Sequence, residues 1–240
     1  MSAPDRVTRL AVVVPVNDEE ALLPRCLEAL EVAVANVRAE RPALRVAVVI
    51  VLDDCTDRSA AILRSSPFAV VEVGHRRVGA ARAAGVGAAT DLLGRGSPAR
   101  LWIASTDADS AVPPQWLTHQ LALAEDGADL VVGTVRPDFD DLSPAQQAAW
   151  VATHPGGLAN GHVHGANLGI RGDTYRAAGG FPGLAEHEDV GLVARARAAG
   201  ARVVASDGGR VLTSGRPTGR TPGGYARHLR EDLVRDAQVG

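Results

Sequence analysis

The sequence contains no lysine, because all 25 of its basic residues are arginine. Chemistry that depends on a lysine amine is therefore excluded, including the P-loop contact with nucleotide phosphates, the Schiff base and the kinase-type phosphate contact. Any phosphate bound by this chain has to be held by arginine, by backbone amides or by a metal ion.

Aromatic residues and cysteines are also scarce. Aromatics make up 3% of the 240 residues, so aliphatic side chains have to fill the core and few rings remain for stacking on bases. With a formal net charge of -3, the chain is not expected to bind nucleic acid. Its two cysteines, Cys26 and Cys55, are too few for a disulfide framework.

Long hydrophobic runs are missing as well. No apolar run approaches the roughly 20 residues that span a membrane, and the first residues do not have the pattern of a signal peptide. We therefore expect a cytoplasmic protein without a transmembrane segment. Peripheral attachment at the inner face of a membrane stays open, and so does a homodimer.

Apolar runs alternate with helical patterns in the first 135 residues. Strands are expected at 10–16, 45–52, 68–73, 100–105 and 128–135, and helices at 19–40, 57–66, 77–93 and 113–126. The strands are nearly continuous runs of valine and isoleucine. This pattern predicts an α/β fold with a mostly parallel sheet that is covered by helices on both faces.

The pattern loosens after about residue 137. The stretch 136–172 is expected to form loops and one helix at 144–153, followed by a helix at 186–200, strands at 201–206 and 209–214, and a final helix in the tail. No repeat or linker divides the chain. We expect a single domain over residues 1–240, with 1–135 and 136–240 as its two halves.

Three acidic loops directly follow predicted strands, at 17–20, 53–57 and 107–109. In open parallel sheets, ligands bind beyond the carboxyl ends of the strands. The three loops should therefore meet at one edge, where their carboxylates would suit a metal ion or a polyhydroxyl ligand.

Asp107 and Asp109 are the strongest candidates within these loops. Residues two apart in an extended segment point to the same side, so both carboxylates can face one ligand. Mg²⁺ and Mn²⁺ prefer such oxygen ligands, often together with phosphates of the substrate. An isolated pair of this kind is more often a solvated turn, but its position after a buried strand favours a clamp for a metal-bound diphosphate.

Arginines near the end of the third strand, Arg76, Arg77 and Arg82, could contact a diphosphate at the start of the next helix. The same helix contains Gly85 and Gly87, but their spacing and position do not match a dinucleotide-binding turn. Packing of the helix against the sheet is the better interpretation of these glycines.

Several later groups have both a chemical and a plain structural interpretation. His162 and His164 could bind a metal or could be polar loop residues. Glu188 and Asp189 could supply a general base or could only stabilise a helix start. Arg216 and Arg220 could fold over a phosphate as a lid or lie in a solvated tail. For Trp150, a core position is preferred to stacking on a sugar.

Six stretches in this order resemble the family two glycosyltransferases, which have the GT-A fold and bind nucleotide sugars. They are VVVPVNDEEALLPRCLEAL, VVIVLDDCTDRSA, VGAARAAGVGAA, TDADSAVPPQWL, GANLGIRGDTYRAAGGFP and EHEDVGLVARARAAG. Together they cover most of the chain from Leu10 to Arg220.

The resemblance implies a role for each matching residue. Pro15, Asn17 and Glu19 would lie along the base and ribose, Asp53 would hydrogen-bond the base, Arg82 would lie near the base or diphosphate, Asp107 would face the ribose or metal, and Asp109 would bind Mg²⁺ or Mn²⁺. Asp189, paired with Glu188, would deprotonate the acceptor hydroxyl, which then attacks with inversion. Arg216 and Arg220 are counted with the donor-binding residues, and His164 as a further metal ligand.

Departures from the family pattern keep other possibilities open. Leu52 and Asp54 replace the usual Asp and Gly, which leaves the choice of nucleotide undecided. The alternatives are a retaining GT-A transferase with a histidine metal ligand and a catalytically silent nucleotide-sugar-binding protein. A nucleotidyltransferase is disfavoured because the first strand leads into an acidic loop without glycine. The acceptor, whether small molecule, lipid or glycan, is not indicated.

Overall fold

In the computed structural model, which describes residues 5–219 and 223–235, eight strands form one sheet in the order β3-β2-β1-β4-β7-β6-β8-β5. The strands are β1 (Arg9–Val16), β2 (Arg45–Asp53), β3 (Ala69–Val73), β4 (Leu101–Ser105), β5 (Ser110–Ala111), β6 (Leu130–Pro137), β7 (Leu168–Arg171) and β8 (Val203–Thr213). β1 pairs in parallel with both β2 and β4. The predicted α/β fold with a mostly parallel sheet is confirmed.

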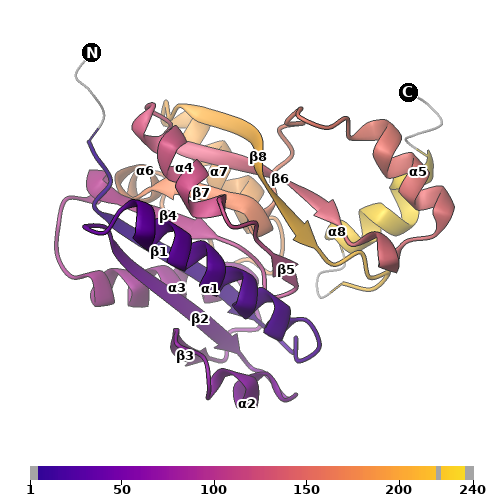
Figure 1. The fold of residues 1–240 in the computed structure, drawn as a ribbon, viewed down its shortest axis with the longest axis horizontal. Coiled ribbons are helices and arrows are strands. Elements are labelled where there is room, and N and C mark those ends of the chain that lie inside the picture. The colour runs from indigo at the N-terminus through magenta and orange to yellow at the C-terminus, as the bar shows by residue number, and fades with distance from the viewer. Residues whose placement is uncertain (1–4, 220–222, 236–240) are drawn as a thin grey trace.

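Helices cover both faces of this sheet (Figure 1). On one face lie α1 (Leu23–Glu40), α2 (Ser59–Leu63) and α4 (Trp116–Glu125), and on the other lie α3 (Val78–Leu93), α6 (Gly172–Ala177) and α7 (Glu188–Ala198). Successive residues of β1 point to opposite faces, so Val12 packs in the first layer and Val13 in the second. Burial on both faces explains why the strands are continuous apolar runs.

Two parts of the sheet differ from the expectation. β7 and α6 lie in a stretch expected to form loops or given no element, and β7 runs antiparallel between β4 and β6. β8 is one strand where two were expected. It continues through Gly208 and Gly209 as a bulge: Gly133 of β6 pairs with Ser206 and Val135 pairs with Val211, so the extra residues lie in β8.

A helix from the middle of the chain and the last described helical turns together form a small cap with its own core. The cap consists of α5 (Pro144–Thr153), α8 (Tyr225–Arg227) and the helical turns at His228–Asp232, which Figure 1 shows together at one end of the molecule. Trp150 is buried in this core, as expected, and donates a hydrogen bond to the Tyr225 hydroxyl at 3.2 Å. The cap therefore packs largely on itself beside the carboxyl end of the sheet.

The helix α3 lies close to the sheet at one glycine. A Cβ on Gly85 would lie 2.4 Å from Cγ1 of Val13 and 2.8 Å from Cγ2 of Val51, whereas a Cβ on Gly87 would meet nothing within 4 Å. The packing role expected for these glycines therefore belongs to Gly85. Close approach at this point brings the start of α3 to the carboxyl edge of β2.

These two glycines provide a matched test of the packing. Gly85→Ala should lower the free energy of unfolding by about 1–3 kcal/mol, because its methyl group would overpack the valines of β1 and β2. Gly87→Ala should raise it by about 0.5–1 kcal/mol, because alanine loses less backbone entropy in a helix. Urea unfolding curves measure both, and equal effects would contradict this account of the helix–sheet contact.

Candidate functional site

A cavity of about 830 Å³ opens at the carboxyl ends of the parallel strands, where the three acidic loops meet. Each described candidate residue lines it: Pro15, Asn17, Glu19, Asp53, Arg82, Asp107, Asp109, His164, Glu188, Asp189 and Arg216. Arg220 lies outside the described residues. The convergence predicted from the strand ends is therefore present in the structure, and it includes residues from both halves of the chain.

Hydrogen bonds tie the first acidic loop to the second. The Asp18 carboxylate accepts from the backbone N–H of Thr56 at 2.6 Å and of Asp57 at 3.1 Å, and Asp57 accepts from the N–H of Glu20 at 2.8 Å. Asp18, Cys55 and Asp57 are also the group of possible metal ligands that lie close together among the described residues. Because both carboxylates already accept backbone hydrogen bonds, their evident role is to fix the loops.

Asp53 has a similar role at the start of α3. Its buried carboxylate accepts backbone hydrogen bonds from His75 at 2.6 Å, Arg76 at 2.9 Å and Arg77 at 3.1 Å. Asn17 is bound to the same place, because its side-chain amide donates to the Asp53 carbonyl at 2.7 Å. The contact of Asp53 with a base stays a prediction, and it would have to share these oxygens.

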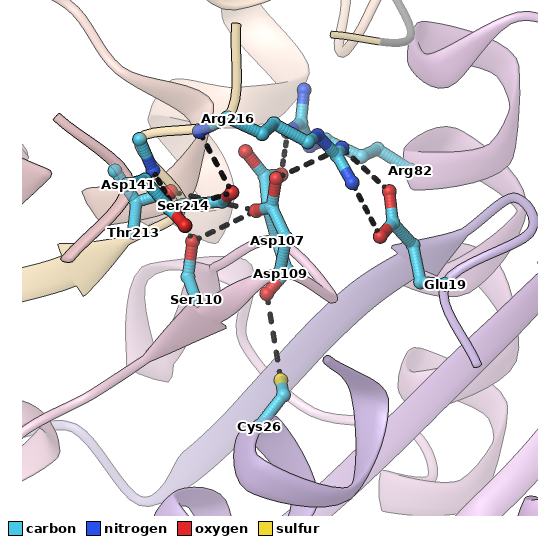
Figure 2. Close-up of polar contacts among 11 residues, drawn as sticks. Glu19, Cys26, Arg82, Asp107, Asp109, Ser110, Asp141, Thr213, Ser214 and Arg216 are labelled. Carbon is cyan, nitrogen blue, oxygen red and sulfur yellow. Dashed lines mark hydrogen bonds and ion pairs between the residues drawn. The ribbon is translucent and has the colours of Figure 1, made fainter. Parts of the chain in front are cut away.

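Arg216 lies between two of the acidic side chains (Figure 2). It follows β8 and donates to both oxygens of Glu19, each at 2.7 Å, while the same guanidinium lies 3.0 Å from Oδ2 of Asp109. Ser110 and Thr213 donate to the other Asp109 oxygen at 3.2 Å and 3.4 Å. The Asp109 carboxylate is thus held from three sides and faces one cation.

The charge balance around Asp109 fits a metal ligand. Burial raises its pKa, the neighbouring charge of Asp107 adds to this, and together they outweigh Arg216, so that the pKa reaches about 6. The raised pKa means that the positive charge of Arg216 does not fully compensate for the burial of the Asp109 carboxylate and its repulsion by Asp107. The hard oxygens of Asp107 and Asp109 are suitable ligands for Mg²⁺ or Mn²⁺, and Arg216 shows that a cation is stabilised here.

Arg82 lies deeper than the other arginines of the cavity. Its side chain is 3% exposed and forms ion pairs with both Asp107 and Glu188. Glu188 is the first residue of α7 and is also buried. The next residue, Asp189, is half-buried, lines the cavity and accepts a hydrogen bond from the N–H of Val190 at 2.8 Å.

Histidines and a tyrosine form the wall of the cavity next to the cap. Burial, and then the charge of His162, lowers the pKa of His164 to about 4, so its ring is neutral at pH 7 and can offer a lone pair. The ring of Tyr225 lies edge-on to that of His164 at 5.5 Å between centroids. In the part of the chain that the structure describes, His164 does not join a close group of three metal ligands.

Sequence reasoning missed much of this wall. His154 stacks on Trp150 with 4.5 Å between ring centroids, and His154, Tyr225 and His228 all line the cavity. These residues come from the two sides of the cap, and no spacing in the sequence joins them. The packing of α8 against α5 brings them together.

A family model described as Glycosyl transferase family 2 matches residues 11–177. No curated protein sequence gives a significant match. In the described residues, no helix is both long and apolar enough to cross a lipid bilayer.

Solved structures with a similar fold include three glycosyltransferases. The mannosyltransferase PcManGT from Pyrobaculum calidifontis, in complex with GDP-Man and Mn²⁺, has a TM-score of 0.63 and 20% identity over 98% of this chain and 64% of its own. TarS (residues 1–349) from S. aureus has a TM-score of 0.62 and 16% identity over 87% and 61%. The present chain thus spans less than two thirds of either chain.

The third is glucosyl-3-phosphoglycerate synthase from Mycobacterium tuberculosis, in complex with Mn²⁺, UDP and phosphoglyceric acid. Its TM-score is 0.60, with 16% identity over 96% of this chain and 78% of that one. At these identities the similarity establishes a common GT-A fold. The roles of individual residues therefore have to be argued from this chain itself.

The pKa of Asp109 leads to a test by stability. Its pKa is raised in the folded state, so folding is penalised above about pH 6, and the penalty disappears as the pH falls through the folded and then the unfolded pKa. Asp109→Asn should therefore raise the free energy of unfolding at pH 8 in EDTA, by up to about 3 kcal/mol. The gain should shrink toward pH 4.

Asp207 supplies the control with the opposite sign. Burial would raise its pKa, but hydrogen bonds from Arg210 and Thr134 outweigh this and lower it. Asp207→Asn should therefore destabilise the protein at pH 8 and have less effect in acid. Urea unfolding at both pH values measures these changes, and a loss of stability for Asp109→Asn at pH 8 would contradict the charge balance described above.

Proposed function

The chain belongs to glycosyl transferase family 2, and on that premise we propose that it is a metal-dependent hexosyltransferase. It would move a sugar from a nucleoside diphosphate to the hydroxyl group of an acceptor. The observation that carries this proposal is the half-buried Asp109 carboxylate beside Asp107, at the carboxyl edge of the sheet and facing a cation. The cavity volume of about 830 Å³ is also in the range of sites for small ligands.

The donor would occupy the side of the cavity formed by the first half of the chain. Pro15, Asn17, Glu19 and Asp53 would line the base and ribose. Asp107 and Asp109 would hold Mg²⁺ or Mn²⁺, which when bound supplies positive charge to the departing diphosphate. Arg216 is the exchangeable cation of the site, because it can keep its two hydrogen bonds to Glu19 while its contact with Asp109 is given up.

Asp189 would act as the general base. It lies at the cavity and is half-buried, so an acceptor hydroxyl can reach it, and removal of the proton would allow in-line attack on the anomeric carbon with inversion. The acceptor would then enter beside the cap, along the wall of His162, His164 and Tyr225. NMR of the product would distinguish inversion from a retaining reaction that uses His164 as a metal ligand.

Binding of nucleoside diphosphates tests the donor site. We expect calorimetry to find one nucleoside diphosphate that binds in the presence of Mn²⁺ and at least tenfold more weakly in EDTA. Asp109→Ala should remove the metal-dependent part of the affinity, because the carboxylate supplies a ligand oxygen. The remote Asp207→Ala is the control and should leave it unchanged. If the nucleotide bound equally well with Mn²⁺ and in EDTA, and equally to Asp109→Ala and Asp207→Ala, this metal site would be excluded.

Sugar transfer tests the base. Asp189→Asn should keep the affinity for the metal-bound nucleotide within about threefold and lower kcat by about 10²–10⁴-fold, the usual contribution of general base catalysis. Donor affinity is measured by calorimetry and transfer by product analysis after an acceptor screen. Loss of donor binding in this variant would contradict the assignment, and so would full retention of kcat.

A further inference from the structure

Arg82 connects three segments that the proposed reaction has to keep in register. It belongs to α3, Asp107 follows β4, and Glu188 begins α7. One guanidinium nitrogen forms an ion pair with Asp107 and the other terminal nitrogen forms one with Glu188. The planar fork of one arginine therefore spans the distance between the loop of Asp107 and the helix that carries Asp189.

The surroundings leave the guanidinium of Arg82 little freedom. A Cβ on Gly165 would lie 2.4 Å from one of its terminal nitrogens, so the group fits against a bare backbone, and the ring of Phe181 lies 5.8 Å away. The start of α3 is held against the loop before α7 as well, because the N–H of Gly79 donates to the Leu184 carbonyl at 3.1 Å. The contacts of α3 with Phe181 and Leu184 join this helix to the segment that leads to Asp189.

Glu188 is poorly placed to act as a base itself. Its side chain is 4% exposed and its carboxylate is paired with Arg82, whereas Asp189 lines the same cavity and is half-buried, so a substrate can reach it more easily. A carboxylate bound to a guanidinium in a buried site has little tendency to accept a proton from a substrate. Of these two consecutive acids, Glu188 therefore binds Arg82 inside the protein, and Asp189 is left to meet the acceptor.

We infer that Arg82 and Glu188 are positioning residues, which together fix Asp189 relative to Asp107 and so align the acceptor hydroxyl with the donor. This inference rests on the proposed function, in which Asp189 is the base. A displacement of about 1 Å in such a site can cost about 100-fold in rate, and the donor contacts proposed for Pro15, Asn17 and Asp53 do not involve Glu188. The expected signature is therefore a loss in kcat with a smaller change in donor binding.

Two conservative variants test this arrangement. Glu188→Gln should lower kcat by about 10–100-fold, while the affinity for the metal-bound nucleotide stays within about threefold. Arg82→Lys should lower kcat to a similar extent and also weaken nucleotide binding, because one ammonium cannot reproduce the fork between Asp107 and Glu188. Unchanged kcat in Glu188→Gln would overturn the inference.

Arg171 provides the matched control for loss of a buried arginine. It is equally buried, but it lies at the other end of the sheet and donates to backbone carbonyls, among them Ala99 at 2.8 Å and Ala124 at 2.6 Å. Arg171→Lys should lower stability and leave kcat unchanged. If its kcat falls as far as that of Arg82→Lys, the effect of Arg82 is only structural and the inference fails.

Amide hydrogen exchange gives a measurement that does not depend on activity. Arg82→Lys should speed exchange at both 106–112 and 184–192, Glu188→Gln mainly at 184–192, and Arg171→Lys at neither. Unchanged protection of both segments in Arg82→Lys would exclude the connection. If the wild-type protein transferred no sugar to any acceptor, the proposed function would fail, whereas the exchange pattern would still decide whether Arg82 links the two segments.

Discussion

The structure depends on the neutralisation of carboxylates that gather at one edge of the sheet. Asp107 and Asp109 follow β4, Glu19 follows β1 and Glu188 begins α7, and two arginines share these four acids. Bringing four buried or half-buried carboxylates together without cations would be strongly unfavourable. The two guanidinium groups reduce this penalty, although part of it remains at Asp109, and their contacts hold the loops together.

The sequence predicted the parts of the fold that periodicity controls. Continuous apolar runs identify the parallel strands, and the acids that follow them predict one site at the carboxyl edge, because this edge is shared by all parallel strands. β7 was missed because it has only four residues and is preceded by a stretch of glycine, histidine and asparagine. Its role in the sheet comes from burial between β4 and β6, which no local pattern records.

The contacts within the site could not be predicted from the sequence either, because they join residues that are far apart along the chain. Arg216 and Glu19 are 197 residues apart, and only the complete fold places the segment after β8 against the loop after β1. Arg82 was expected near the base or diphosphate, but a helix pattern cannot show that its guanidinium points inward to Glu188. The residue types thus identified which residues belong to the site. Only the structure shows which of them face the cavity and which, like Arg82 and Glu188, mainly contact each other.

Backbone strain collects at the same edge. Asp18, Asp54, Arg76 and His187 are the non-glycine residues with positive φ in the described part of the chain, and all four line the cavity. Each such conformation costs about 1–3 kcal/mol, so the surroundings have to compensate for it. At Arg76 the compensation is visible, because its N–H donates to the buried Asp53 and its side chain pairs with Asp54.

The two arginines of the site differ in a way that separates support from exchange. Arg82 is 3% exposed and bound on both sides by acids, so a cation arriving from solvent cannot readily replace it. Arg216 is 25% exposed and lies on the segment after β8, where, in the proposed function, a metal ion would compete for Asp109 while Glu19 still holds the arginine. Arg82 therefore holds the segments of the site together. In the proposed function, a metal ion would replace Arg216 at Asp109, so that this carboxylate would still face a positive charge.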